Sequence, residues 1–407
     1  MNMLRPLDQT IGVENLTGAE ESGAGYMGSR TTSRVSVIIP TYNHEHYVCQ
    51  AVDSALRQTY PDAEVLVVDD GSTDGTQQRL AAYGDNIRYI YQPNKGLAAA
   101  RNTGVRAAQG GHFLFLDADD MIPPEKLGAQ MPVLEANPDS GLVYSAWQHI
   151  SADGTRVLGE SRPARQGHMF RELLRQRFSF PVASAVVRRT CFERIGLLDE
   201  TLTAAEDTDL WLRIARAGYA FGYVDHPLFQ YRVVQGSVSR HHAHQARNAL
   251  ALLDRFFSEP NLPAELAGLR SEAYGALHYE HAARFYHAGT LEAAREHLRQ
   301  ALTICPELGA DEEWVLEWIA GYALGPDVEA PHRFIDDVFT NLPPEGAALR
   351  GLRRRAHGRH NAARAFSAYQ GHEWRQVRRS VLQALLYDPA LIGNRGLVRI
   401  ALQSLGV

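Results

Sequence analysis

The chain has 407 residues, of which 45% are hydrophobic and 22% are charged. This length gives room for two or three domains with their own cores, and the composition excludes a disordered, collagen-like or coiled-coil protein. Because 47 acidic side chains outnumber 41 basic ones, for a net charge of −6, no global cationic field would attract nucleic acid, and we expect no nucleic-acid partner.

The N-terminal segment and the cysteines bear on location. Residues 1–33 carry acidic side chains and several glycines but no apolar core of a secretory signal, so we expect a flexible tail. The longest apolar run, Val35–Ile39, is too short for a membrane helix, so we expect no transmembrane segment. Cys49, Cys191 and Cys305 are widely spaced without a Cys-x-x-Cys pair, which favours a reducing, cytoplasmic setting.

The first predicted elements, up to about residue 120, alternate between strands and helices. Short β-branched runs predict the strands, and the apolar-periodic segments between them predict the helices. This alternation favours an α/β fold with a mostly parallel central sheet covered by helices. The predicted strands are Val35–Ile39, Glu64–Asp69, Ile87–Tyr91 and His112–Leu116, and the predicted helices begin near Tyr47, Thr76 and Gly96.

Polar clusters follow three of these strands. They are Thr41-Tyr42-Asn43, Asp69-Asp70-Gly71 and Asp117-Ala118-Asp119-Asp120. In open α/β sheets, ligands bind outside the carboxyl ends of the strands. We therefore expect one site assembled from several loops.

Beyond residue 120 the pattern is less regular. Leu142–Ile150 and Ala183–Arg188 are predicted as strands, and Phe170–Arg177 as a helix. Another helix follows Glu206-Asp207, with an apolar face made by Leu210, Trp211, Ile214 and Ala215.

After about Arg240 the strand signals fade, and we expect residues 241–407 to form an all-helical domain. An offset of 83 residues matches parts of this region to each other, for example Tyr286 with Tyr369. We therefore predict two antiparallel helix pairs, at about residues 270–306 and 360–390.

The first of these pairs resembles a tetratricopeptide unit. The second matches less well, because Gly289 is replaced by His372 and Ala294 by Val377. Such repeats normally occur in runs of three or more, so these helix pairs must pack on other helices.

Five motifs occur in one order along residues 34–240. They are Val35-Ser-Val-Ile-Ile-Pro-Thr-Tyr-Asn43, Val67-Val-Asp-Asp-Gly-Ser-Thr-Asp-Gly75, Asn94-Lys-Gly96 with Ala100-Arg-Asn102, Leu116-Asp-Ala-Asp-Asp120, and Ala205-Glu-Asp207 before Leu210-Trp-Leu-Arg213. With these motifs the segment resembles the family 2 inverting glycosyltransferases, which have the GT-A fold. The resemblance implies sugar transfer from a nucleotide-diphospho-sugar with inversion at C1.

Asp117 and Asp119 are the candidate metal ligands. They lie one residue apart at a strand end, so an extended backbone points both carboxylates to one side, where they can hold Mg²⁺ or Mn²⁺. The metal would bridge the protein and the diphosphate as a Lewis acid. The alternative is that these acidic residues only end a strand and begin a turn. By the resemblance, Asp119 is the more dependable ligand.

The loops also supply candidates for binding the donor. Asp70 can accept a hydrogen bond from a base N–H such as uracil N3, and the resemblance assigns it to the nucleotide base. A turn-forming Asp, a core tyrosine at Tyr42 and an exposed helix arginine at Arg101 are the alternatives. The full predicted nucleotide- and substrate-binding set is Pro40, Tyr42, Asn43, Asp70, Arg101, Asp117 and Glu206.

Asp207 is the candidate catalytic base. The acceptor hydroxyl loses a proton as it attacks, and the resemblance assigns that proton to the Asp of the Glu-Asp pair. The like charge of Glu206 or partial burial would raise the pKa of Asp207 usefully. The alternative is that Glu206, Asp207 and Asp209 only complement the N-terminus of a helix.

One position departs from the family pattern. Family members often carry a His shortly after a Tyr-Arg pair, where it contacts the metal or the diphosphate. Here Tyr231-Arg232 is followed by Val234 at the His position, which leaves metal ligation from this loop in doubt. Substitutes nearby in the sequence are Gln235, Ser237, His241 and His242, although a run of histidines is more often solvated surface.

Two segments of the sequence bear on the acceptor, and neither identifies it. The segment from Phe180 to Asp199 resembles the acceptor side of the family, but the sequence does not show which acceptor it binds. Arg353-Arg-Arg355 begins the only dense basic run, which is either a solvated helix face or a contact for anionic lipid headgroups or a lipid-linked acceptor. A cytoplasmic protein, peripheral at the inner face of the plasma membrane, would suit the second reading.

The sequence thus predicts a metal-dependent inverting glycosyltransferase that uses a UDP-, dTDP- or GDP-sugar to extend a surface polysaccharide or a lipid-linked oligosaccharide. The contrasting hypothesis is an inactive transferase-like scaffold whose tetratricopeptide-like helices recruit protein partners, and the intact acidic motifs argue against it. A nucleotidyltransferase would need a Gly-rich basic loop after the first strand, where this chain has Pro40-Thr-Tyr-Asn-His44. The sugar, the nucleotide, the acceptor and the role of the helices stay open.

Overall fold

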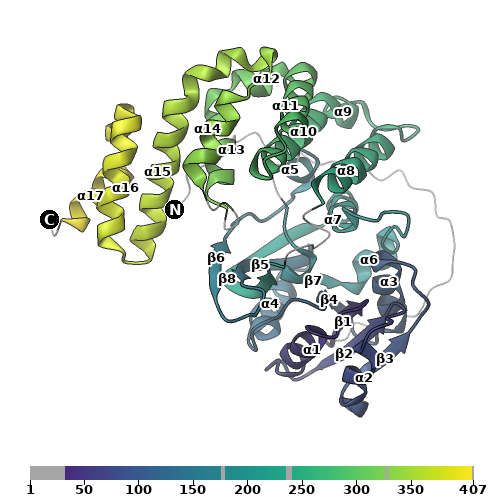
Figure 1. Cartoon of the computed structure of the whole chain (residues 1–407). Coiled ribbons are helices and arrows are strands. Elements are labelled where there is room, and N and C mark those ends of the chain that lie inside the picture. The colour runs from purple at the N-terminus through teal and green to yellow at the C-terminus, as the bar shows by residue number, and fades with distance from the viewer. Residues whose placement is uncertain (1–32, 176–178, 235–240, 326–327, 329, 406–407) are drawn as a thin grey trace. The chain divides into compact units, whose positions relative to one another are not determined.

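Figure 1 shows the computed structural model, which describes residues 33–175, 179–234, 241–325, 328 and 330–405. Apart from residue 33, the predicted N-terminal tail lies outside the described residues. Gln235 and Ser237, two of the candidate substitutes for the family His, lie outside them as well.

The first part of the chain forms an eight-stranded mixed sheet. Its strands are β1 Val35–Thr41, β2 Ala63–Asp69, β3 Arg88–Tyr91, β4 His112–Phe115, β5 Ser140–Ile150, β6 Val157–Ser161, β7 Ala185–Arg188 and β8 Ala220–Arg232. The order across the sheet is β3-β2-β1-β4-β7-β5-β6, and β8 pairs with β5. The first four strands are parallel, whereas β7 is antiparallel to both β4 and β5.

Helices pack against this sheet. They are α1 Val48–Leu56, α2 Thr76–Ala81, α3 Leu97–Ala107, α4 Lys126–Glu135, α5 Phe170–Leu174, α6 Arg189–Ile195 and α7 Glu206–Arg216. The alternating pattern predicts α1, α2 and α3, whereas α4 and α6 are not predicted from the sequence. Helix α3 lies very close to β1, since a Cβ atom on Gly104 would come within 2.3 Å of the Ile38 side chain. Only glycine permits this approach, which places α3 directly against β1.

The predicted α/β fold class is confirmed, and the differences lie in the second half of the sheet. The predicted strand Ala183–Arg188 begins only at Ala185, after a short 3₁₀ turn. Strands β6 and β8 are not predicted from the sequence. In β8 the pairing with β5 shifts register around Pro227, which breaks the alternation that reveals a half-buried strand.

The rest of the described chain is helical, as predicted. Its elements are α8 His242–Phe257, α9 Ala264–Ala267, α10 Arg270–His287, α11 Leu291–Ile304, α12 Pro306–Ala310, α13 Glu312–Ala323, α14 Pro331–Thr340, η4 Pro344–Leu352, α15 Arg353–Gln370, α16 Trp374–Tyr387, η5 Pro389–Gly393 and α17 Arg395–Ser404. Among these described helices, none has the length and apolarity that crossing a bilayer requires.

The 83-residue offset found in the sequence holds element by element. Adding 83 to the bounds of α10, α11 and α12 gives those of α15, α16 and η5, and α13 and α17 begin at matching residues. The caps match too, because Asp311 accepts from the N–H of Trp314 as Asn394 does from that of Leu397. We call residues 270–324 the first copy and residues 353–407 the second copy.

The hydrophobic core does not stop where the sheet ends. Leu252, Leu253, Phe256 and Phe257 of α8 are buried in the same cluster as the sheet and helices α1 to α7. Most of the first copy forms a second cluster with α14 and η4, and the second copy forms a third. The predicted boundary at residues 240/241 therefore falls between a sheet and a helix that share one core.

Candidate functional site

The loops that follow β1 and β2 are held together by hydrogen bonds. The Asn43 side chain accepts from the Thr73 backbone N–H at 2.7 Å, and the Asn43 N–H donates to the Ser72 hydroxyl at 2.9 Å. Asn43 has a φ of 56°, in the left-handed region that Asn tolerates better than most residues. Tyr42, next to it, is 44% exposed, so its ring is accessible to a ligand, while Pro40 is buried within β1.

The Asp70 carboxylate is buried and has three hydrogen-bond donors of its own. Its Oδ1 accepts from Gln92 Nε2 at 2.7 Å and from the Lys95 N–H at 2.9 Å, and its Oδ2 accepts from the Gly96 N–H at 2.8 Å. Asp70 therefore fixes the loop that leads into α3. Its predicted contact with a nucleotide base is an additional role that stays a prediction.

Arg101 of α3 links two of the predicted acidic residues. Its Nη2 donates to Asp117 Oδ1 at 2.7 Å and its Nη1 donates to Glu206 Oε1 at 2.6 Å. Burial disfavours the charged guanidinium, but the charges of Asp117 and Glu206 outweigh it and raise the pKa of Arg101. At 2% exposure, Arg101 is a buried bridge between the loop after β4 and the start of α7, and not the exposed helix arginine of the alternative.

Arg232, the last residue of β8, fixes the loop that carries the candidate metal ligands. Its Nε donates to the Asp119 carbonyl at 2.6 Å, and its backbone N–H donates to Asp120 Oδ1 at 2.7 Å. Its Nη1 and Nη2 donate to the Ala152 carbonyl at 2.9 Å and to Gln50 Oε1 at 2.8 Å. Sequence reasoning used the Tyr-Arg pair only as a marker for a His and missed this positioning role.

The acidic loop concentrates negative charge. Burial and the charge of Asp117 raise the pKa of Asp119, and the nearby His44 opposes that shift. Burial and both neighbouring carboxylates also raise the pKa of Asp120 well above its usual value. A positive charge placed here would therefore be stabilised. His44 follows β1, and sequence reasoning did not single it out as a site residue.

This charge crowding fits a divalent cation. Within the described ranges, no group of three or more His, Cys, Asp or Glu side chains is arranged to hold a metal ion. Asp117 and Asp119 suit a cation that takes its remaining oxygen ligands from a diphosphate and water, as Mg²⁺ usually does. Val234, at the family His position, is half-buried and offers no ligand atom.

Asp207 lies in the first turn of α7 beside Glu206. Its Oδ1 accepts from the Thr208 N–H at 2.7 Å. Burial, followed by the charge of Glu206, raises the pKa of Asp207 to about 6, and the charge of Arg101 opposes this shift. The residue ahead of the pair, Ala205, has a φ of 62°, a strained conformation of the kind that clusters at functional sites. A carboxylate that titrates near neutrality suits general base catalysis.

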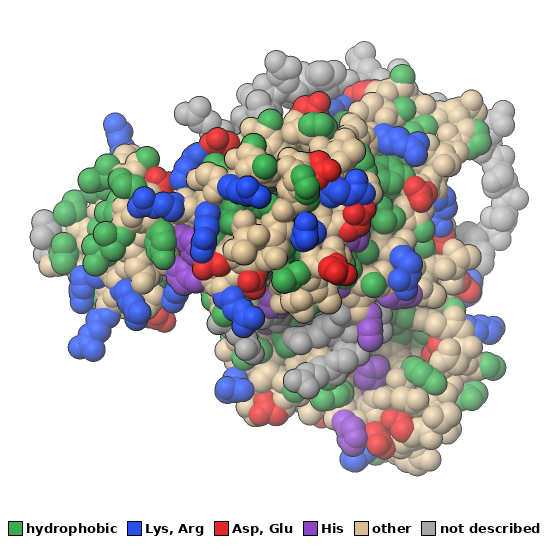
Figure 2. Space-filling model, turned by 45° about the horizontal axis from the view of Figure 1, so that its top comes forward, with side chains coloured by type: hydrophobic (Ala, Val, Ile, Leu, Met, Phe, Trp, Pro, Cys, Tyr) green, Lys and Arg blue, Asp and Glu red, His purple; other side chains and the backbone are tan. Residues whose placement is uncertain are grey.

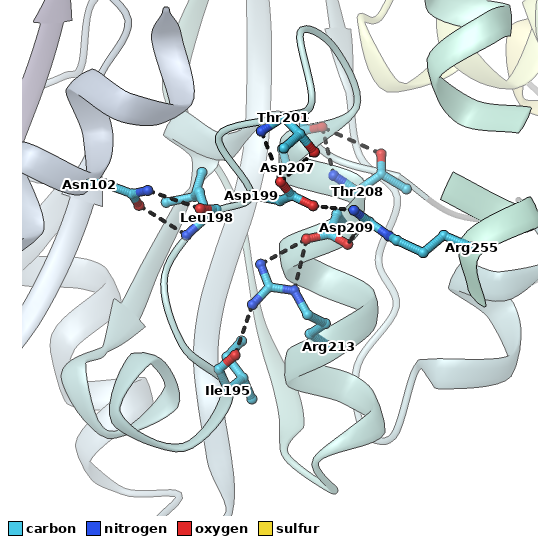
Figure 3. Close-up of polar contacts among 10 residues, drawn as sticks. All are labelled: Asn102, Ile195, Leu198, Asp199, Thr201, Asp207, Thr208, Asp209, Arg213 and Arg255. Atoms are coloured by element: carbon cyan, nitrogen blue, oxygen red, sulfur yellow. Dashed lines mark hydrogen bonds and ion pairs between the residues drawn. The ribbon is translucent and has the colours of Figure 1, made fainter. Parts of the chain in front are cut away.

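Figure 3 shows how the segment that leads into α7 is held from two sides. Asn102 of α3 exchanges two hydrogen bonds of 2.9 Å with the backbone of Leu198. Arg255 of α8 pairs with Asp199 and, at 2.9 Å, with Asp209. The candidate base is therefore positioned by the sheet part of the chain and by the first helix of the helical region together.

A groove of about 750 Å³ lies beside this segment. Thr203, four residues before Asp207, lines it together with the first turn of α8, including His241 and His242, and the turn between α10 and α11. The Thr203 hydroxyl lies 3.1 Å from His244 Nε2. In this groove, residues of α8 and of the turn between α10 and α11 lie next to the loop that leads to the candidate base. The sequence did not predict this proximity.

A family model described as Glycosyl transferase family 2 matches residues 36–196. An uncharacterized glycosyltransferase of Rickettsia prowazekii (strain Madrid E) is 34% identical over 232 residues, which cover 54% of this chain and 69% of that protein. EpsJ, an uncharacterized glycosyltransferase of Bacillus subtilis (strain 168), is 33% identical over 208 residues, which cover 49% and 60% of the two chains.

Longer proteins match over a smaller share of their length. Chondroitin synthase of Pasteurella multocida (strain Pm70) is 30% identical over 190 residues, or 45% of this chain and 19% of the synthase.

Among solved structures, Staphylococcus aureus TarS 1–349 aligns with 80% of this chain and 88% of its own, at 19% identity and a TM-score of 0.47. The mannosyltransferase PcManGT from Pyrobaculum calidifontis, in complex with GDP-Man and Mn²⁺, aligns with 76% and 86%, at 22% identity and a TM-score of 0.48.

Proposed function

We propose, from the premise that this chain belongs to glycosyl transferase family 2, that it moves a sugar from a nucleotide-diphospho-sugar to a hydroxyl group of a glycan or lipid-linked acceptor, with inversion at C1. The observation that carries the proposal is the arrangement around Arg101, which joins Asp117 of the donor-side loop to Glu206, the neighbour of the candidate base. One buried arginine would thus connect the residues that bind the donor with those that act on the acceptor.

The donor would lie over the ends of β1, β2 and β4. Tyr42 offers an exposed ring beside the base, and Asp70 offers a carboxylate whose position is already set by three N–H donors. Asp117 and Asp119 would hold a Mg²⁺ or Mn²⁺ ion. Such an ion supplies positive charge to the leaving diphosphate. Arg101 and Arg232 keep the loop that bears these carboxylates in place.

The acceptor would approach Asp207 from the side of the helical region. Asp207 takes the proton from the acceptor hydroxyl as its oxygen attacks C1 and the bond from C1 to the diphosphate breaks. Attack from the face opposite the leaving group inverts the anomeric carbon. The groove lined by Thr203 and α8 is the candidate path for this acceptor. A polysaccharide acceptor accords with the names of the chondroitin and hyaluronan synthases that this chain resembles over part of their length.

Donor binding is tested by calorimetric titration with UDP, GDP and dTDP, with and without Mn²⁺. We expect one nucleotide to bind in a metal-dependent way, and the Asp119→Ala variant to lose that dependence. Asp85→Ala, at an exposed position of a 3₁₀ turn, is the matched control and should bind like the parent chain. If a folded sample binds none of the nucleotides with metal present, the scaffold hypothesis gains and the transferase proposal fails.

The role of Asp207 is tested by the Asp207→Asn variant. Transfer should fall by about 10²–10⁴-fold, the usual contribution of a general base, while nucleotide affinity should stay unchanged because the proposal places Asp207 on the acceptor side. Release of the nucleotide product in the presence of acceptor is the measurement. Turnover close to that of the parent chain would remove Asp207 from the role of base.

A further inference from the structure

The two copies of the helical repeat have opposite charge. The second copy contains ten arginines and two acidic residues, for a formal net charge of +8, whereas the first copy has four arginines and nine acidic residues, for −5. Because the copies share one arrangement of helices, the fold itself does not demand this difference. The charge of the second copy therefore needs an explanation outside the packing of the helices.

The predicted basic run at Arg353–Arg355 does not provide the explanation. Arg355 pairs with Glu312 and Glu313 of α13, and Arg353 pairs with Asp336 of α14 at 2.8 Å. These arginines join the second copy to the preceding helices. The ion pairs occupy Arg353 and Arg355 within the chain, and the sequence hypothesis that this run contacts lipid stays a prediction.

The arginines of α16 have no such partners. Arg375 and Arg379 are exposed, and neither forms an ion pair with any carboxylate in the described part of the chain. They share one face of α16 with Leu382 and Leu386, at helical spacings of four, three and four residues. These leucines are 61% and 64% exposed. The helix thus presents a stripe of two arginines followed by two leucines to the solvent.

The first copy provides an internal comparison for this stripe. The equivalent positions on α11 are also largely exposed and carry Glu292, Glu296, Arg299 and Thr303. Glu296 and Arg299 neutralise each other in an ion pair of 2.6 Å. The same helix face in the first copy therefore carries polar residues, so the repeat fold does not by itself require leucines at these positions of α16.

The next elements extend the same chemistry. Ile392 of η5 is 69% exposed and Leu402 of α17 is 47% exposed. With Arg395 and Arg399 they line a shallow groove of about 550 Å³. In Figure 2 hydrophobic side chains and arginines gather over these C-terminal helices, at the left of the view. Arginines beside exposed aliphatic side chains are the composition of surfaces that lie in a membrane interface.

We propose that the stripe on α16, together with the exposed residues of η5 and α17, binds the surface of an anionic lipid bilayer. The arginines pair with headgroup phosphates, and the leucines and the isoleucine enter the boundary between headgroups and acyl chains. This surface goes beyond the proposed transfer reaction and does not depend on it. It would hold the chain at a membrane, where a lipid-linked acceptor resides.

The test is co-sedimentation of the full chain with vesicles of phosphatidylglycerol and phosphatidylcholine, compared with vesicles of phosphatidylcholine alone. Two double variants install residues of the first copy at exposed positions: Arg375→Glu with Arg379→Glu, and Leu382→Arg with Leu386→Thr. We expect binding to the anionic vesicles only, weakened about 30-fold or more by the first variant, since each arginine near a bilayer contributes about fivefold. The second variant should weaken binding at high salt, where the apolar contribution remains.

Controls separate this result from misfolding and from the transfer proposal. Arg295→Glu with Arg299→Glu, on α11, should leave vesicle binding unchanged, and nucleotide titration should be the same in all variants. Equal binding to both kinds of vesicle, or equal binding by the α16 variants and the parent chain, overturns the proposal. Self-association that the α16 variants abolish, without vesicle binding by the parent chain, identifies the face as a contact between copies of the chain and overturns it as well.

Discussion

Arg101 shows how a single buried side chain can couple two parts of a site. Its two ion pairs place a cation between Asp117, in the proposed donor-side loop, and Glu206, next to the candidate base Asp207. The planar fork of arginine presents separate N–H donors to the two carboxylates in a fixed geometry, which the compact ammonium of lysine does not reproduce. The Arg and Asn of the Ala-Arg-Asn motif thus both have structural contacts, since Arg101 makes these two ion pairs and Asn102 binds the backbone of Leu198.

Removing the guanidinium should therefore cost both stability and activity. We expect Arg101→Met to lower the free energy of unfolding by about 3 kcal/mol, because it leaves two carboxylates without their buried partner. Arg106→Met on the same helix is the control, since the pair of Arg106 with Glu200 is exposed and spans 3.5 Å; it should cost less than about 1 kcal/mol. Equal losses in urea unfolding of the two variants would contradict the bridging role.

The raised pKa of Asp207 predicts how the rate depends on pH. With a pKa of about 6, the Asp207 carboxyl group is mostly charged at pH 7, and its charged fraction falls about tenfold per pH unit below the pKa. We expect kcat/KM to rise with pH up to about pH 6 and then to level off. The measurement is the pH profile of transfer at saturating metal, and a flat profile between pH 5 and pH 7 would count against Asp207 as the base.

The same shift has a consequence for stability. Because the pKa of Asp207 is higher in the folded chain than in the unfolded one, its contribution to folding is fully present at low pH and is lost as the pH rises through about 6. The Asp207→Asn variant has no carboxyl group to ionise at this buried position. The free energy of unfolding of the variant, relative to that of the parent chain, should therefore increase between pH 4 and pH 7.

At the scale of elements, the two copies of the repeat keep their backbone although their residues diverge. Gly289 and His372 occupy equivalent positions after α10 and α15, and both have positive φ, of 71° and 56°. The replacement of Gly289 by His372, which weakens the tetratricopeptide resemblance, thus leaves the left-handed end of the helix in place. The cost is a strained histidine.

A glycine should relieve that strain. We expect His372→Gly to raise the free energy of unfolding of the second copy by about 0.5–1 kcal/mol, and Gly289→Ala to lower that of the first copy by a similar amount. The edge contact of His372 with Trp374 offsets part of the first gain. Thermal unfolding of both variants is the measurement, and a loss of stability in His372→Gly would show that this contact outweighs the strain.

At the scale of the whole molecule, the helical region is not an independent appendage. Helix α8 buries its apolar face in the core of the sheet part, and its Arg255 pairs with Asp199 in the loop before Asp207 and with Asp209 in α7. The second copy, by contrast, has a separate core. The predicted boundary at residues 240/241 stays a proposal for the chain's organisation, but the packing predicts that a cut there would expose a core.

Two buried leucines of the helical region should therefore behave differently. Leu253→Ala, in α8, and Leu397→Ala, in α17, each remove a side chain that is at most 1% exposed, at a cost of about 2–5 kcal/mol. We expect only Leu253→Ala to reduce the hydrogen-exchange protection of α7. Unchanged protection of α7 in Leu253→Ala would mean that the sheet part does not depend on α8.

Features that depend on local pattern are readable from the sequence alone. Alternation and β-branched runs predict the first strands, and the 83-residue period predicts the repeat, as the structure confirms. The acidic clusters at the strand ends single out Asp70, Asp117 and Asp119 as candidates, and their roles stay predictions. Each of these signals lies within a short window, or recurs at a constant interval, so it is readable without knowledge of the chain's path.

Only the tertiary structure decided which of these residues meet and what holds them. The Arg101–Glu206 pair joins residues 105 positions apart, and Arg232 reaches Gln50 across 182 positions. The burial of α8 in the sheet core and the exposed leucines of α16 are equally invisible in the sequence, because an amphipathic helix looks the same whichever surface it faces. Such pairings follow from the path of the whole chain, since burial and charge compensation act between segments that no local pattern connects.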